Sequence, residues 1–366
     1  GFTKYIQARW GSPYKVGPTL GRVANEIVSS DLVYKKIIGM QMMIEGLAMG
    51  AFAMAYENTN DPVLKTLLKY TMSDEAFHHK FGKIWADRTV PKLTKKEHIK
   101  DEDCDEKIFV DGRIIIRDNF DKLLEKNSKI FIFGEDVGKI GDVNQGLEGL
   151  QKKYGINRVF DTSIRESTIV GQGIGMSMRG LRPIAEIQYL DYLIFAIQTL
   201  SDDLATMLYR SVGKQLAPLI IRTRGHRLEG IWHSGSPIGM LINSLRGVRI
   251  LLPRNMVKAA GMYNALLKSY EPAIVIEPLN AYRLKEKEPI NYADFCPKIG
   301  KVDYIRRGED ITVVSYGSTL RIVDKACDLL KEHDINIDLI DIQSIIPFDI
   351  DNDIVKSLKR TNKPVS

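Results

Sequence analysis

The sequence contains only three cysteines, Cys104, Cys296 and Cys327, and they lie far apart. Without a pair at CxxC spacing, neither a zinc site nor a disulfide framework is indicated, and such usage is typical of a reducing, cytoplasmic compartment. No apolar run reaches about 18 residues, so no membrane span is expected. The N-terminus has no basic-then-apolar signal segment. It begins with Gly1 in place of Met, which indicates a fragment or a processed product.

A strong excess of one charge is also missing. Lys and Arg total 52 against 46 Asp and Glu, which gives a net charge of +6. The longest basic cluster, from Lys92 to Lys100, is interrupted by Glu97 and suits a solvated helix end better than a nucleic-acid surface. We therefore expect no nucleic-acid partner. A chain of 366 residues is too long for one ordinary core and predicts two or three domains.

The hydrophobic period changes near residue 100. Over residues 31–57, apolar residues recur at spacings of three and four, which predicts a helix. A break follows in which Asp61 is the expected N-cap and Pro62 the first position of a second helix, over about 62–87. Residues 1–100 are therefore predicted to contain a helical hairpin, and the acidic stretch 101–106 to be a linker.

Beyond this linker, short apolar runs alternate with amphipathic helices, which predicts a mainly parallel sheet covered on both faces. Strands are expected at 130–133, 184–187, 219–221, 248–252 and 274–276, and helices at 166–179, 191–211, 237–246 and 255–269. A second linker, over about 283–300, leads to strands at 311–315 and 335–340 and helices at 319–333 and 350–359. The expected fold is thus an α/β domain at 107–284 and a second, truncated α/β domain at 300–366.

Three residues of the N-terminal part are candidate metal ligands. Glu75 and His78 form a Glu-x-x-His, which puts both side chains on one helical face, and Glu45 lies on the preceding helix. Residues 1–98 resemble the second half of a ferritin-like di-iron-carboxylate bundle, whose ligands suit iron or manganese. A complete site needs a further Glu and a further Glu-x-x-His, so we expect at most an incomplete iron site. A plain hairpin with ordinary histidines is the competing interpretation.

Nucleotide-binding motifs are not found in the α/β region. Gly171-Gln-Gly173-Ile-Gly175 lacks the final spacing of GxGxxG and lies inside an expected helix, and there is no Walker loop. These glycines are expected to let the helix pack closely against a neighbour.

The order of several other motifs is more informative. They are, along the chain, Ile132-Phe-Gly-Glu-Asp-Val-Gly138, Asp161-Thr-Ser-Ile-Arg-Glu166, Ile184-Ala-Glu-Ile-Gln-Tyr-Leu-Asp-Tyr192, Ile221-Arg-Thr-Arg-Gly-His226, Ile231-Trp-His-Ser-Gly-Ser-Pro237 and Leu252-Pro-Arg-Asn255. This succession resembles the beta subunit, or beta half, of the thiamine-diphosphate-dependent decarboxylating component of 2-oxo acid dehydrogenases, over about 107–366. The resemblance implies a transketolase-like pyrimidine-binding domain at 107–284 and a transketolase-like C-terminal domain at 300–366.

In that family, a Glu at a helix start hydrogen-bonds to N1′ of the cofactor's aminopyrimidine and keeps it protonated, so that the 4′-amino group can deprotonate the thiazolium. Glu166 matches this position. A charge-assisted hydrogen bond in a dry site is strong. A carboxylate favoured by the helix dipole alone is the structural alternative for Glu166, and the surrounding motif favours catalysis.

The resemblance extends to further site residues. Ile164, Gln188 and Tyr192 match positions that line the aminopyrimidine, and His233 matches a histidine near the reacting acyl group. His226 is either a second such histidine or a residue of a surface loop. Arg222 and Arg224 form either an anion contact or a salt bridge between subunits, and the sequence leaves both open.

The diphosphate and its Mg²⁺ are held in that family by a Gly-Asp-Gly motif, whereas this chain has Gly141-Asp-Val. The resemblance therefore implies an alpha subunit that supplies the Mg²⁺ ligands, a beta–beta contact, and a lipoyl-bearing acyltransferase that accepts the acyl group. Pyruvate and branched-chain 2-oxo acids both remain open as substrates. The competing hypotheses are a ferritin-like metal protein fused to a non-catalytic α/β segment, and a chimera of two truncated pieces.

Overall fold

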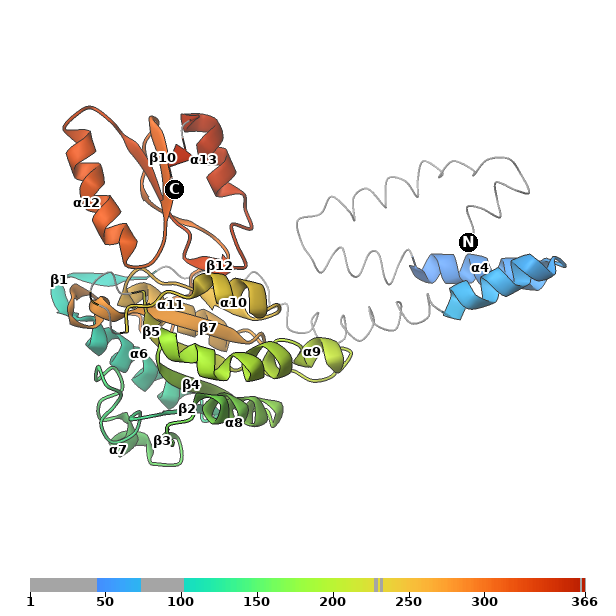
Figure 1. Cartoon of the computed structure of the whole chain (residues 1–366), viewed down its shortest axis with the longest axis horizontal. Helices are drawn as coiled ribbons and strands as arrows, with labels where there is room; N and C mark the ends of the chain where they lie inside the picture. Colours follow the sequence, from blue (N-terminus) through green and yellow to red (C-terminus); the bar gives the residue numbers. More distant parts are fainter. Residues whose placement is uncertain (1–44, 74–101, 227–229, 231–232, 363, 366) are drawn as a thin grey trace. The chain divides into compact units, whose positions relative to one another are not determined.

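The computed structural model describes residues 45–73, 102–226, 230, 233–362 and 364–365. The chain divides into two compact units, residues 1–97 and 98–366, drawn in Figure 1. No helix in these described ranges is long and apolar enough to cross a membrane.

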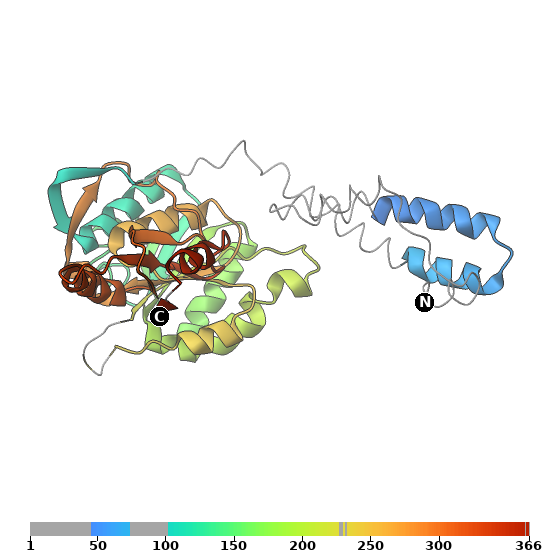
Figure 2. The ribbon, with the colours of Figure 1, turned by 90° about the horizontal axis from the view of Figure 1, so that it is seen from above.

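The N-terminal unit contains the predicted hairpin. Helix α4 (Glu45–Asn58) and a second helix over 62–73 lie side by side (Figure 2). Asp61 Oδ1 accepts hydrogen bonds from the backbone N–H groups of Val63 at 2.8 Å and Leu64 at 3.2 Å, which confirms Asp61 as the N-cap. The Glu45 side chain and the whole of Glu75 and His78 lie outside the described residues, so the metal site stays a prediction.

A seven-stranded sheet, in the order β12-β6-β7-β5-β4-β2-β3, organises the second unit. Its pairings are parallel except for that of β12 with β6, which is antiparallel. All five predicted strands are present. The strands are β2 (Ile130–Gly134), β3 (Val159–Asp161), β4 (Arg182–Tyr189), β5 (Ile220–Gly225), β6 (Arg249–Leu251), β7 (Ala273–Pro278) and β12 (Ser344–Ile346).

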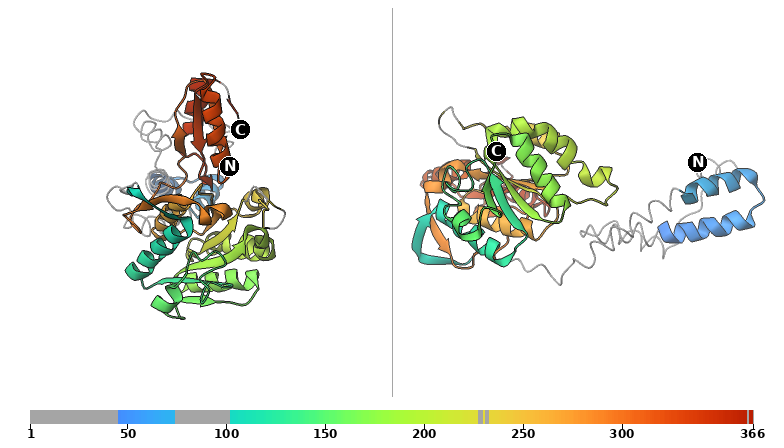
Figure 3. Two further views of the ribbon diagram at one scale, coloured as in Figure 1. Left: turned by 90° about the vertical axis from the view of Figure 1, so that its left-hand side faces the viewer. Right: turned by 90° about the horizontal axis from the view of Figure 1, so that it is seen from below.

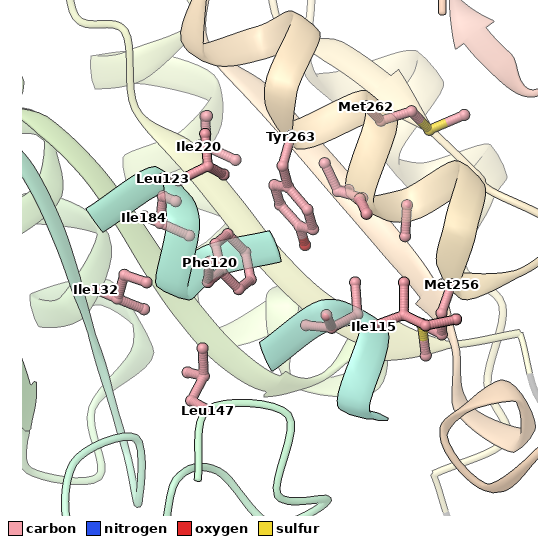
Figure 4. Packing of buried hydrophobic residues seen from close by; sticks show 14 of the residues in the cluster. Ile115, Phe120, Leu123, Ile132, Leu147, Ile184, Ile220, Met256, Met262 and Tyr263 are labelled. Carbon is pink, nitrogen blue, oxygen red and sulfur yellow. The ribbon is translucent and has the colours of Figure 1, made fainter. Parts of the chain in front are cut away.

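Two apolar cores cover the two faces of this sheet. Successive residues of a strand alternate between the cores, as Ile132 and Phe133 of β2 do, which explains why these strands are continuous apolar runs. One core packs under α6 (Gly112–Lys126) and α11 (Met256–Leu267), where Phe120 meets Tyr263 with ring centroids 4.8 Å apart (Figure 4). The other lies under α8 (Glu166–Met178) and α10 (Ile238–Ser244).

The predicted helix over 191–211 is wrong in kind. The chain forms a 3₁₀ helix η3 (Leu190–Ala196), a π-helical turn η4 (Thr199–Leu204) and the short α9 (Met207–Arg210). The buried residues of η3 are spaced by three and those of η4 by four. A spacing of three keeps side chains on one face of a 3₁₀ helix, so the local period, and not its average over the segment, decides the helix type.

Both predicted linkers are also corrected. Strand β1 (Cys104–Asp111) begins within the first, and β8 (Lys285–Pro289) lies within the second; the two pair antiparallel as a separate ribbon. Most residues of β1 and β8 carry charge or lie partly exposed. Their pairing depends on backbone hydrogen bonds, which composition does not report.

The C-terminal strands form a four-stranded sheet in the order β13-β10-β11-β9, flanked by α12 (Thr319–Lys331) and α13 (Asp353–Thr361) and seen from two more sides in Figure 3. The strands are β9 (Asp303–Arg306), β10 (Ile311–Ser315), β11 (Ile337–Asp341) and β13 (Pro364–Val365). Strand β12 instead joins the first sheet, so the predicted domain 300–366 is not self-contained. Arg254, shortly after β6, also forms ion pairs through its Nη1 with Asp303 of β9 at 2.7 Å and Asp341 of β11 at 3.0 Å.

Glu286 of β8 caps α11, and the burial of its carboxyl group predicts a pH dependence. Its two carboxylate oxygens accept the N–H groups of Met256 at 2.8 Å and Val257 at 3.0 Å, while burial raises the pKa of Glu286 from 4.5 to about 6. The folded chain therefore holds this proton more tightly than the unfolded chain. The resulting stability is complete below about pH 4.5 and is lost as the pH rises through about 6.

We compare the native chain with the variant Glu286→Gln. The free energy of unfolding of the native chain, minus that of the variant, is expected to fall by about 1–2 kcal/mol between pH 4 and pH 7. Urea unfolding of both proteins across this range measures it. A constant difference between the two proteins would contradict the raised pKa.

Candidate active site

The carboxyl ends of the parallel strands bring the predicted site residues to one edge of the sheet. Glu135 and Asp136 follow β2 directly, and Gln188 lies near the end of β4, the neighbour of β2 in the sheet. In open parallel sheets, ligands bind at this edge. The topology therefore explains why motifs far apart in the sequence meet here.

Hydrogen bonds hold both the side chain and the backbone carbonyl of Gln188. Its side-chain Nε2 donates to Asp136 Oδ2 at 3.1 Å, and its carbonyl oxygen accepts from Arg224 Nη1 at 3.1 Å. Asp136 adopts a positive φ of 58°, which a short polar residue tolerates best among residues with a Cβ. The amide of Gln188 is thus oriented by a turn that the sequence analysis did not single out.

Glu166 is the first residue of α8 and is half-buried. The pKa of Glu135 is raised, first by burial and then by the negative charges of Asp136 and Glu166. Asp136 and Glu166 therefore lie close enough to Glu135 to repel its negative charge. Glu135 was missed as a site residue, although it lies inside a motif that carries the family resemblance.

Aromatic rings form the other side of the site. The His233 ring stacks on Tyr189 with centroids 3.7 Å apart and meets Tyr192 edge-on at 5.5 Å. The pKa of Tyr192 is raised by burial and, to a lesser degree, by Tyr189, Glu135, Asp191 and Glu166. Four of the predicted residues, Glu166, Gln188, Tyr192 and His233, thus gather around Glu135 and Tyr189.

Ile164 is placed differently. It lies in the turn before α8 with 73% of its surface exposed. An exposed apolar side chain beside a carboxylate is a surface feature in the single chain, so its predicted contact with the pyrimidine ring stays a prediction. Ile194 and Phe195 of η3, next to Tyr192 in the sequence, are likewise 54% and 66% exposed.

Arg222 and Arg224 have a role that the sequence analysis did not consider. Both are fully buried, together with Asp142, Glu186 and Glu277, beneath the site. Arg222 reaches Glu186 at 2.5 Å, Asp142 at 2.9 Å and Glu277 at 2.9 Å, and Arg224 reaches Glu186 at 2.5 Å. The salt bridges are within the chain, so neither the anion contact nor the intersubunit salt bridge describes them.

Within this buried network, the pKa values of Asp142 and Glu186 are shifted in opposite directions. Burial alone would raise the pKa of Asp142, but Arg224 and Arg222 outweigh it and hold that pKa below its usual value. Burial raises the pKa of Glu186 in spite of the same two arginines. Asp142 is therefore committed to the network as an anion.

His226 is also corrected in position. It is buried, with 8% of its surface exposed, at the carboxyl end of β5, and it faces the C-terminal sheet as well as the His233 segment. It is therefore not a surface-loop residue, and its role as a second histidine near the acyl group stays a prediction.

Comparison with known proteins identifies the family of the domain that carries this edge of the sheet. Residues 110–285 match the family described as transketolase, pyrimidine binding domain, and residues 300–366 match transketolase, C-terminal domain. The pyruvate dehydrogenase E1 component subunit beta of Acholeplasma laidlawii is 36% identical over 250 residues, which cover 68% of this chain and 76% of that protein. The chain belongs to the family of 2-oxo acid dehydrogenase beta subunits.

Other relatives agree with this family. The 2-oxoisovalerate dehydrogenase subunit beta of Bacillus subtilis is 32% identical over 241 residues, which cover 66% of this chain and 73% of that protein. A solved structure titled split gene transketolase, inactive beta4 tetramer, has a TM-score of 0.54 at 17% identity and covers 70% of this chain and 77% of its own; it shows the fold.

Membership in the beta-subunit family confirms the predicted transketolase-like fold, and it supports the dehydrogenase interpretation over the ferritin-like alternative. Both matches lie beyond residue 109, so the ferritin-like resemblance of residues 1–98 is not confirmed.

Proposed function

We propose that residues 107–366 form the aminopyrimidine-binding half of a thiamine-diphosphate enzyme that oxidatively decarboxylates a 2-oxo acid and passes the acyl group to a lipoyl arm. The observation that carries this proposal is the gathering of Glu166, Gln188, Tyr192 and His233 at the carboxyl edge of a sheet that matches a pyrimidine-binding domain.

The residues present fit an aminopyrimidine. A protonated ring nitrogen needs an anionic acceptor, and the half-buried Glu166 sits where two further carboxylates, Glu135 and Asp136, already make the local potential negative. When bound, thiamine diphosphate would supply the nucleophilic thiazolium carbon that attacks the 2-oxo group.

The chain's own residues would then have separate tasks. Glu166 would hold the proton on N1′ of the ring by accepting a charge-assisted hydrogen bond. Gln188, oriented by Asp136, would orient the ring's polar edge, and Tyr192 with Ile164 would offer apolar contact. His233, stacked on Tyr189, would move a proton or stabilise charge at the acyl group.

The diphosphate side of the site is expected from an alpha subunit. Asp142, the only acidic residue of Gly141-Asp-Val, is buried and bound to Arg222 at 2.9 Å, which leaves it no geometry for Mg²⁺ at a surface. Exposed apolar residues beside the site, Ile164, Ile194 and Phe195, support a covering partner. A beta–beta contact, a lipoyl-bearing acyltransferase and a cytoplasmic location complete the proposal.

The 2-oxo acid is open between pyruvate and branched-chain acids, since relatives named for each resemble this chain to a similar degree. Much of the substrate pocket would come from the alpha subunit.

Reconstitution tests the function. The full chain, mixed with an alpha subunit of this family, Mg²⁺ and thiamine diphosphate, is expected to reduce an artificial electron acceptor when pyruvate or 2-oxoisovalerate is added. Mixtures that omit one of the three additions are the controls and are expected to be inactive. Absence of activity with every alpha subunit and both acids would remove the proposal.

For the N-terminal unit we propose no function. The partial ferritin-like interpretation of residues 1–98 stays a prediction, because Glu45, Glu75 and His78 lie outside the described side chains. Iron analysis of the purified chain tests this interpretation, and stoichiometric iron would support it.

A further inference from the structure

The imidazole of His226 binds two parts of the chain at once. Its Nδ1 lies 3.2 Å from Ser236 Oγ, and its Nε2 lies 3.2 Å from Thr319 Oγ1, at the start of α12. The ring also stacks on Tyr316 with centroids 4.9 Å apart. Both ring nitrogens therefore have partners, and these partners come from different segments.

The backbone around His226 is shaped to allow this arrangement. His226 itself has a positive φ of 52°, which is uncommon for a residue with a Cβ. Gly317 packs directly on the ring, where a Cβ would lie 2.5 Å from Cδ2. Burial lowers the pKa of His226, and a neutral ring suits its two partners, because one hydroxyl can donate to the unprotonated ring nitrogen while the other accepts from the protonated one.

Ser236 ends the short segment that carries His233. Next to it, Gly235 packs so closely on Asp191 that a Cβ would collide with the carboxylate. Asp191 and Ser236 also line a surface cavity of about 360 Å³ with Ile194, Pro237 and Met240. The His226–Ser236 contact thus anchors the C-terminal side of His233, whose ring lies on Tyr189 at 3.7 Å.

We infer that His226 is a positioning residue: its Nδ1 contact with Ser236 holds His233 against Tyr189 in the site, while its Nε2 contact with Thr319 ties that arrangement to the C-terminal sheet. The inference rests on the proposed role of His233 in acyl transfer. The two contacts of His226 can be tested separately. In His226→Asn the side-chain amide occupies the place of Nδ1, and in His226→Gln it occupies the place of Nε2.

The first test needs neither cofactor nor partner. In the full chain labelled with ¹³C-histidine, the Cε1–H signal of His233, assigned by its loss in His233→Ala, carries the ring-current shift of Tyr189. We expect this signal to move toward its unstacked position in His226→Gln and Ser236→Ala, and to stay in place in His226→Asn and Thr319→Val. An unmoved signal in the first pair, or the same displacement in all four variants, overturns the inference.

The second test uses the reconstituted enzyme and two assays. Transfer of the acyl group to a lipoylated acyltransferase domain is expected to fall about 10–10²-fold in kcat for His226→Gln and Ser236→Ala. Decarboxylation measured with an artificial acceptor is expected to stay within about twofold, with unchanged KM for the 2-oxo acid. Equal losses in both assays would make His226 a folding element and reject the positioning role.

The two proposals fail separately. If His233→Ala transfers acyl groups as fast as the native chain, the proposed role of His233 fails, while the ring-current test still decides whether His226 positions that ring.

Discussion

Replacement of Glu166 by alanine is expected to lower the decarboxylation rate of the reconstituted enzyme by ~10²–10⁴-fold, the usual scale for a lost acid–base element. In the proposed site, loss of this carboxylate would leave N1′ of the ring without an anion to hold its proton. The 4′-amino group would then be a poor base, so the loss should appear in kcat whichever 2-oxo acid is used. The measurement is steady-state decarboxylation with an alpha subunit, Mg²⁺ and saturating thiamine diphosphate.

Glu309→Ala is the matched control, since it removes an exposed carboxylate from the C-terminal sheet region and should leave kcat unchanged. Glu166→Gln should be as slow as the alanine variant, because an amide can still hydrogen-bond but carries no charge. Native activity in either Glu166 variant would show that another residue holds the ring proton. Glu135, whose pKa is raised by burial and by its acidic neighbours, would be the next one to test.

Replacement of Arg222 by methionine is expected to lower the free energy of unfolding by about 3–5 kcal/mol. Arg222 is fully buried and is bound to Glu186, Asp142 and Glu277. A methionine fills part of the volume but leaves these carboxylates with Arg224 as the one remaining cation of the network. Uncompensated buried charge is far more costly than the loss of an exposed pair.

Urea unfolding of the full chain, followed by circular dichroism, measures this loss. Arg210→Met is the control: its ion pair with Asp202 spans 3.6 Å between side chains that are 54% and 68% exposed, so the expected loss is below about 1 kcal/mol. A loss of similar size in both variants would mean that solvent reaches the network. Because Arg224 also donates to the carbonyl of Gln188, a disturbed network should weaken cofactor binding as well.

Local patterns were enough for the centre of the fold. The runs at 130–133 and 274–276 became β2 and β7 because strands buried on both faces are mostly apolar. Helix α8 begins at Glu166, as predicted. The order of the motifs also predicted Glu166, Gln188, Tyr192 and His233, which the structure brings to one edge of the sheet because parallel strands deliver their carboxyl ends there.

Sequence patterns failed where contacts between residues distant in the sequence determine the local structure. Glu135 and Tyr189 were overlooked, although each lies inside a motif that carries the family resemblance, because their interactions with Glu166 and His233 join different segments of the chain. The strands β1 and β8 were taken for linkers because charged residues in a ribbon need no apolar period. The helix over 191–211 was misjudged because its buried residues are spaced by three in η3 and by four in η4, so no single helical period covers the segment.

The sequence by itself determined the parallel α/β fold, its family and the carboxylate at the start of α8, because these follow from periodicity and from short contiguous motifs. Only the tertiary structure decided that Arg222 and Arg224 lie inside the protein, that β12 crosses to the first sheet, and that His226 joins Ser236 to Thr319. The reason is physical: burial, charge pairing and hydrogen bonding belong to pairs of groups, and the carboxylates that bind the two arginines, the strand that pairs with β12 and Thr319 all lie far from their partners in the sequence.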